Sequence, residues 1–95
     1  MLLPELPPPE AEPADHRLKR LRMRSMRRGI KEMDIILSRF VDARLDRMGA
    51  YDLVLYDELL SENDQDLYQW VTAQVEAPAR FAGLIAEIMK TAGRP

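Results

Sequence analysis

Apolar positions recur at helical spacing through most of the chain, and no alternating run of β-branched residues predicts a strand. The pattern predicts five short helices, whose expected apolar faces are Leu18, Leu21 and Met26; Ile30, Met33, Leu37, Phe40, Val41 and Met48; Leu53, Tyr56, Leu59 and Leu60; Leu67, Trp70, Val71 and Val75; and Phe81, Leu84, Ile85, Ile88 and Met89. Gly49 is expected to end the second helix, and Asn63 or Asp64 to cap the fourth. Because the connections are brief, the expected fold class is all-α: a compact bundle of five short antiparallel helices over residues 16–92.

The first fifteen residues differ in composition from the rest of the chain, because they hold five of its seven prolines. Residues 1–15 are therefore expected to form a disordered, Pro-rich acidic tail, with polyproline II character around residues 7–9. A solvated tail is one interpretation, and a ligand for a proline-binding partner is the other. The segment lacks the features of a secretory signal or a transit peptide, and no stretch is long enough to span a bilayer. We therefore expect a cytoplasmic protein.

Charge is strongly segregated along the chain, although the net charge is only −2. Residues 17–28 carry seven Lys or Arg and no acid, whereas residues 57–66 carry five acids and no base. A dipolar surface of this kind favours a protein partner with complementary patches. The isoelectric point near 5.4 counts against a nucleic-acid footprint. The basic run nevertheless leaves one alternative open, a small nucleic-acid-binding or toxin-neutralising regulator.

The sequence lacks the residue sets that catalysis and cofactor binding require. It has no Cys, and its single histidine, His16, cannot supply the three or four ligands of a metal site. Ser25, Ser38 and Ser61 have no nearby His base for nucleophilic catalysis. The four glycines are scattered singly, so there is no phosphate-binding loop. The sequence therefore predicts no enzyme, no metal site and no cofactor held by this chain.

The candidate site is the stretch R-R-G-I-K-E-M-D, where Gly29 interrupts the helical pattern. Glycine inside a helix costs about 1 kcal/mol relative to Ala. One interpretation is a plain helix corner with an exposed Arg28–Glu32 pair, which contributes only ~0.3–0.5 kcal/mol. In the other, the missing side chain lets another surface approach closely, with Arg28 as a planar hydrogen-bonding fork and Glu32 orienting neighbouring guanidinium groups. The residues alone leave both interpretations open.

These residues also carry a family resemblance. The sequence resembles the succinate dehydrogenase flavinylation (assembly) factor family, which is marked by an R-G-x-x-E motif between its first two helices, and Arg28, Gly29 and Glu32 stand at the motif positions. M-D follows directly, then R-F-V-D-A, then the acidic and aromatic block Y-D-E-L-L-S-E-N-D-Q-D-L-Y-Q-W. The resemblance covers roughly residues 17 to 92. One departure is Gln65, where many members have Pro.

The resemblance implies a five-helix bundle that acts as an assembly chaperone. Such a protein binds the flavoprotein subunit of succinate dehydrogenase, and often that of fumarate reductase, and promotes covalent attachment of FAD to a histidine of that subunit. The FAD then belongs to the client, and the chaperone contributes positioning rather than acid or base groups. The implied partner-binding residues are Arg28, Gly29 and Glu32, and the candidates around them are Arg24, Arg27 and Asp34.

Tyr68 is a further partner-binding candidate, because it lies off the apolar face of its helix and an exposed amphipathic ring often marks an interface. We expect the free chain to be a monomer, with no nucleic-acid or membrane partner. A chain that itself holds FAD is a third interpretation, and the missing phosphate-binding loop counts against it.

Overall fold

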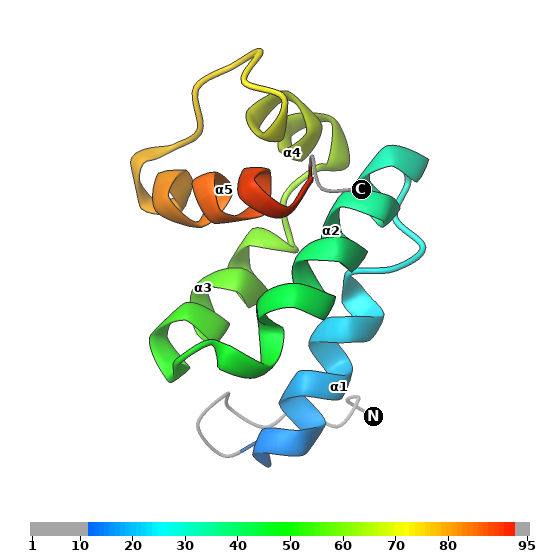
Figure 1. The fold of residues 1–95 in the computed structure, drawn as a ribbon, viewed down its shortest axis with the longest axis vertical. Helices are drawn as coiled ribbons and strands as arrows, with labels where there is room; N and C mark the ends of the chain where they lie inside the picture. The colour runs from blue at the N-terminus through cyan, green and yellow to red at the C-terminus, as the bar shows by residue number, and fades with distance from the viewer. Residues whose placement is uncertain (1–11, 93–95) are drawn as a thin grey trace, which may run out of the picture.

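Five α-helices follow one another in the computed structural model, which describes residues 12–92 (Figure 1). The helices are Ala14–Arg24 (α1), Lys31–Arg44 (α2), Ala50–Leu59 (α3), Asp64–Val71 (α4) and Ala79–Ala92 (α5), and a short 3-10 helix, Leu45–Arg47 (η2), continues from α2. The described residues contain no strand, so the prediction of an all-α fold with five helices is confirmed.

The predicted boundary of the N-terminal tail is wrong at its last residues. Glu12 is bonded to Arg20, and α1 begins at Ala14, so the helical region starts before residue 16. Residues 1–11, which include the predicted polyproline II segment, lie outside the described residues.

α5 packs against three of the other helices. α1 and α2 run in opposite directions, as predicted, whereas the axis of α5 is inclined to that of α2 in the view of Figure 1. α2 and α5 share the most extensive contact between any two helices, and α5 also contacts α3 and α4. None of the described helices combines the length and apolar character needed to cross a bilayer.

The core draws on every helix, because each contributes at least one apolar side chain to it. The buried apolar residues are Leu21, Met33, Leu37, Phe40, Val41, Leu45, Tyr56, Leu59, Leu60, Leu67, Val71, Phe81, Leu84, Ile85 and Ile88. Most of them lie on the faces predicted from helical spacing. The helical periodicity therefore identifies most of the buried surface that holds the fold together.

Three residues expected on apolar faces are exposed instead. α4 ends at Val71 and Ala73 takes a left-handed conformation (φ 63°), so the helical spacing does not extend to Val75. Met26 follows the end of α1, and Met89 lies in α5 but is also exposed. For Val75 and Met26, the prediction failed because the helix ends earlier than the apolar pattern.

Two predictions about helix ends had different outcomes. Asn63 caps α4 as expected, because its side-chain oxygen accepts a hydrogen bond from the Gln65 N–H at 2.7 Å. Gly49 does not end the second helix: α2 ends at Arg44, η2 follows, and Gly49 instead occupies the N-cap position of α3 with an extended backbone.

Candidate functional site

The connection between α1 and α2 spans residues 25–30 and contains the R-G part of the motif. Its left-handed residue is Arg27, with φ 56°, and not the glycine. Gly29 has no positive φ, so conformational freedom does not explain it. A Cβ at Gly29 would lie 3.1 Å from Oδ2 of Asp64, which is tighter than ordinary contact. The glycine therefore makes room for a carboxylate from α4.

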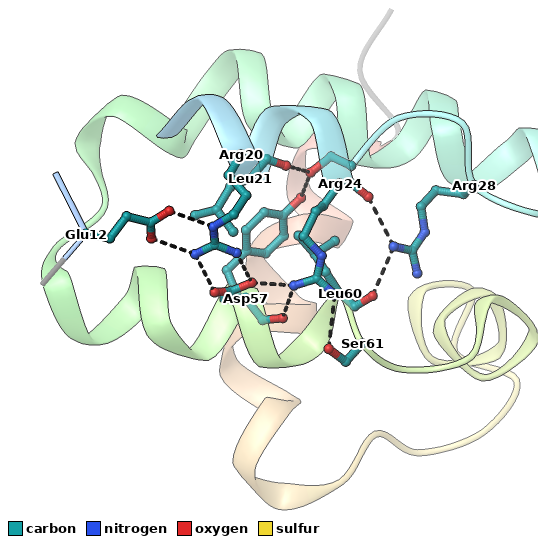
Figure 2. Close-up of polar contacts among 10 residues, drawn as sticks. Glu12, Arg20, Leu21, Arg24, Arg28, Asp57, Leu60 and Ser61 are labelled. Atoms are coloured by element: carbon teal, nitrogen blue, oxygen red, sulfur yellow. Dashed lines mark hydrogen bonds and ion pairs between the residues drawn. The ribbon is translucent and has the colours of Figure 1, made fainter. Parts of the chain in front are cut away.

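The guanidinium group of Arg28 is committed to bonds within the chain. Its Nε donates to Oδ1 of Asp64 at 2.8 Å. Nη1 donates to the carbonyls of Arg24 at 3.1 Å and Leu60 at 3.0 Å, as Figure 2 shows. Nη2 donates to the carbonyl of Glu62 at 3.3 Å. The Arg28 side chain is only 12% exposed. Arg28 therefore ties the end of α1 to the α3–α4 connection, and four of its five N–H donors are occupied.

The backbone of the same loop is held by two carboxylates. Oδ2 of Asp64 accepts a hydrogen bond from the Gly29 N–H at 2.5 Å, and Oδ1 of Asp34 accepts one from the Arg28 N–H. Asp64 is the first residue of α4 and Asp34 lies in the first turn of α2, positions where the helix dipole stabilises negative charge. The loop is thus fixed between two helix N-termini.

The interpretation with an exposed Arg28–Glu32 pair is wrong. Arg28 precedes α2, and its charge is neutralised by Asp64, with which it forms a largely buried ion pair. Glu32 is exposed, in the first turn of α2, and no described residue forms an ion pair with it. Arg27 is also exposed without an ion partner among the described residues. Arg27, Gly29, Lys31 and Glu32 are therefore exposed in the motif region, where an approaching partner can reach them.

A second polar network lies along α1 (Figure 2). Arg20 is bidentate to Asp57, at 2.9 and 2.8 Å, and also bidentate to Glu12, at 2.8 Å for both bonds. Arg24 donates to the Asp57 carboxylate and carbonyl and to Oγ of Ser61 at 3.0 Å. These contacts join α1 to α3.

The network corrects the interpretation of the segregated charges. Arg20, Arg24 and Arg28 recur every four residues along the chain, and each pairs with an acid from the segment 57–66 of the same molecule. The expectation that the basic run faces a complementary patch of a protein partner is therefore wrong for these three side chains. Each of the three side chains makes several hydrogen bonds to charged or carbonyl oxygens within the chain.

Charge and burial shift the pKa values of several groups in the network. Burial by itself raises the pKa of Asp57, but the hydrogen bonds and charges of Arg20 and Arg24 together outweigh it, so its pKa lies below the usual range. The hydrogen bond from Arg20 likewise lowers the pKa of Glu12. These carboxylates are therefore charged throughout the neutral range.

A buried hydroxyl pair lies beneath the second network. Oγ of Ser25 donates to the Leu21 carbonyl at 2.8 Å and lies 2.6 Å from Oη of Tyr56. Ser25 and Tyr56 are both fully buried. Burial raises the pKa of Tyr56 to about 12. The pair satisfies both hydroxyls and fixes the C-terminal end of α1 against α3.

Tyr68 does not have the free exposure that its sequence position suggests. Its ring is half-buried and packs against the core, as does that of Trp70, which lies 6.1 Å from the Phe81 ring. Tyr68 follows Asp64 by four residues on α4, so the two lie on the same side of that helix. Its role at an interface stays a prediction.

Sequence reasoning named Asp64 only as a possible helix cap and did not identify Arg20, Asp57 or Glu12 at all. The available signal was the charge segregation itself, because complementary blocks in one small chain can pair with each other. Among residues 12–92 no three His, Asp or Glu side chains lie close enough together to hold a metal ion.

Fold and site together define a small all-α protein with an exposed loop between α1 and α2. The Arg28–Asp64 ion pair and the hydrogen bonds from the loop N–H groups to Asp34 and Asp64 hold this loop in place. Residues 19–92 match the family described as flavinator of succinate dehydrogenase, and the chain belongs to that family. The family resemblance found in the sequence is thereby confirmed.

Curated relatives give the same assignment. The mitochondrial succinate dehydrogenase assembly factor 2-B of Drosophila mojavensis is 36% identical over 90 residues, covering 93% of this chain and 57% of the relative. Assembly factor 2-A of Drosophila sechellia, also mitochondrial, is 36% identical over 98 residues, covering 97% and 60%. The chain thus spans less than two thirds of the length of these relatives.

Proposed function

We propose that this chain is an assembly chaperone that binds the flavoprotein subunit of succinate dehydrogenase and promotes its covalent flavinylation by FAD. The family match over residues 19–92 carries the proposal. The relatives, which are named as assembly factors for succinate dehydrogenase, support it. The flavoprotein subunit of fumarate reductase is a second client to test.

The docking surface in this proposal consists of the α1–α2 connection, residues 25–30, which we call the motif loop, and the start of α2. Gly29, Arg27 and Glu32 are exposed there and act as contact residues. The side chains of Arg28, Asp34 and Arg24 stabilise this surface without contacting the client, because their polar groups are bonded within the chain. We extend the surface to Tyr68 on α4. The missing side chain at residue 29 leaves the loop backbone within reach of the client.

The chaperone orients the reacting groups of the client and supplies no catalytic group of its own. The client supplies the histidine and the FAD, and the chain itself holds no cofactor. Holding the two reacting groups in a productive orientation reduces the entropic part of the barrier. The composition supports this role, because the sequence has no Cys and one His from which to build a catalytic group. The chain is therefore not an enzyme in this proposal.

The nucleic-acid alternative loses support from the ion pairs. Arg20, Arg22, Arg24 and Arg28 all form ion pairs with acids of the same chain, which leaves fewer cations for phosphate groups. A cytoplasmic location and a monomeric free state stay predictions. The relatives are named as mitochondrial proteins.

The test of the proposed function is capture of the flavoprotein subunit by the immobilised chain, with Glu32→Ala and Glu76→Ala as matched variants. Both glutamates are exposed and lack an ion partner among the described residues, so each change should alter stability by less than about 0.5 kcal/mol. We expect the wild-type chain and E76A to capture the subunit and E32A to bind at least tenfold more weakly.

Two results would contradict this account. Failure of the wild-type chain to capture the subunit, under conditions in which the subunit is folded, would refute the function. Equal capture by E32A and E76A would refute only the assignment of Glu32 to the interface.

A further inference from the structure

Two backbone N–H groups of the motif loop, those of Arg28 and Gly29, point towards carboxylates of the chain itself. The Gly29 N–H donates to Asp64, and the Arg28 N–H donates to Asp34. In a trans peptide the N–H and the carbonyl of the preceding residue point in opposite directions, and no described peptide bond is cis. The carbonyls of Arg28 and Arg27 therefore point away from these carboxylates.

These two carbonyl oxygens have no hydrogen-bond donor among residues 12–92. The next carbonyl along the loop that is bonded is that of Ile30, which accepts from the N–H groups of Met33 and Asp34. Arg27 and Gly29, on either side of Arg28, are exposed, and the Arg27 and Arg28 carbonyls can therefore accept hydrogen bonds from water or from a partner. The exposed carboxylate of Glu32 follows within one turn of helix.

We propose that Asp64 is a positioning residue for the docking surface. Its carboxylate draws the Gly29 N–H inward, so that the loop presents acceptors to the client: the carbonyls of Arg27 and Arg28 and the carboxylate of Glu32. The fitting partner surface carries hydrogen-bond donors, either Arg side chains or unpaired backbone N–H groups of the flavoprotein subunit. This inference rests on the proposed function.

Arg28 makes the arrangement rigid. Its Nε holds Oδ1 of Asp64 at 2.8 Å while Oδ2 takes the Gly29 N–H, so neither oxygen is free to rotate away. The pair is shielded, with side chains 12% and 17% exposed. A loop that is already held in one conformation loses less conformational entropy when the client binds, so binding is stronger. The side chains of Arg28 and Asp64 thus act on the client through the loop backbone without touching it.

Asp57 provides the matched control. It is paired with Arg20 and Arg24 and its side chain is 20% exposed, close to the value for Asp64, but it makes no contact with the loop backbone. Replacing either aspartate by Asn removes one carboxylate charge from an arginine network at nearly equal exposure. A purely structural role predicts the same consequences for both changes, whereas a positioning role separates them.

The experiment compares D64N and D57N in the full chain at a temperature where both are folded. The readouts are the exchange rate of the Gly29 amide proton by NMR, the dissociation constant for the purified flavoprotein subunit, and the covalently flavinylated fraction of that subunit. We expect D64N to accelerate Gly29 exchange and weaken binding at least tenfold each, and to lower flavinylation. D57N should change each by less than threefold.

Equal binding by D64N and the wild-type chain would overturn the inference while leaving the proposed function standing. Equal losses for D64N and D57N would also overturn it, since they would show a general loss of stability. If D64N does not fold, Asp64→Glu compared with Asp57→Glu replaces the pair, because the longer side chain keeps the charge but cannot hold both oxygens against Arg28 and the Gly29 N–H in the same way. A wild-type chain that neither binds nor flavinylates the subunit would refute the proposed function, and this inference with it.

Discussion

The backbone N–H of Gly29 donates a hydrogen bond to the carboxylate of Asp64, a residue 35 positions away in the sequence. The same carboxylate oxygen would lie 3.1 Å from a Cβ at residue 29. Since the glycine has no positive φ, this contact, and not backbone freedom, accounts for the absence of a side chain. The motif loop and α4 are therefore two parts of one site.

Alanine replacements at two glycines should change stability in opposite directions. Gly29→Ala should lower the free energy of unfolding by about 1 kcal/mol, because Asp64 is held by Arg28 and its hydrogen bond must lengthen. Gly83→Ala, inside α5 with open space around the new Cβ, should raise it by about 0.5–1 kcal/mol. Urea unfolding measures both values, and a stabilising G29A would contradict the contact described here.

Lysine at residue 28 should not substitute for arginine. Arg28→Lys keeps the charge but loses the planar fork that reaches Asp64 and the Leu60 and Glu62 carbonyls together, so it should cost about 2 kcal/mol. Arg27→Lys is the control: that side chain is exposed, and the change should stay within about 0.5 kcal/mol. Equal losses from thermal unfolding of the two variants would be inconsistent with the buried pairing.

Asp57 should contribute to the loss of stability in acid. Its pKa is lowered in the folded state, so its contribution is fully present above its unfolded pKa of about 3.9 and is lost as the pH falls through the lower folded value. Asp57→Asn should be less stable at neutral pH but should lose less stability on acidification. Glu12 and Glu87 shift in the same direction, so part of the acid dependence should remain. The free energy of unfolding as a function of pH tests this, and parallel curves would contradict it.

Tyr56 should destabilise the protein in alkali. Its folded pKa is about 12, above the unfolded value of about 10, so its contribution is complete below pH 10 and disappears as the pH rises towards 12. Tyr56→Phe removes the titrating group and the bond to Ser25, so it should cost about 1 kcal/mol at neutral pH and flatten the alkaline decline. Tyr51→Phe, at a 76% exposed position, is the control. An unchanged alkaline slope in Y56F would contradict the assignment.

The sequence predicted the helices well because apolar spacing reports directly on which face of a helix is buried. Leu37, Tyr56 and Ile88 illustrate this, since all three lie on the predicted faces and are fully buried. The pattern failed at Val75 because Ala73 adopts a left-handed conformation and ends the helical spacing. Where a helix ends depends on such local backbone choices, which apolar spacing does not record.

The site was predicted only in part. The position of the motif loop followed from Gly29, but neither interpretation of the motif identified Asp64 as the partner of Arg28. Ion pairs between segments far apart in the sequence depend on how helices pack, so the basic and acidic blocks could be seen while their pairing could not. The interpretation of an outward-facing Arg28 failed for this reason.

The most direct test of the account is the covalent flavin content of the purified flavoprotein subunit, incubated with FAD in the presence and absence of this chain. Denaturation in acid and fluorescence of the separated subunit report covalently bound flavin alone. We predict that the wild-type chain raises the covalent fraction several-fold and that E32A does so much less. A covalent fraction that is the same with and without the chain would contradict the central claim.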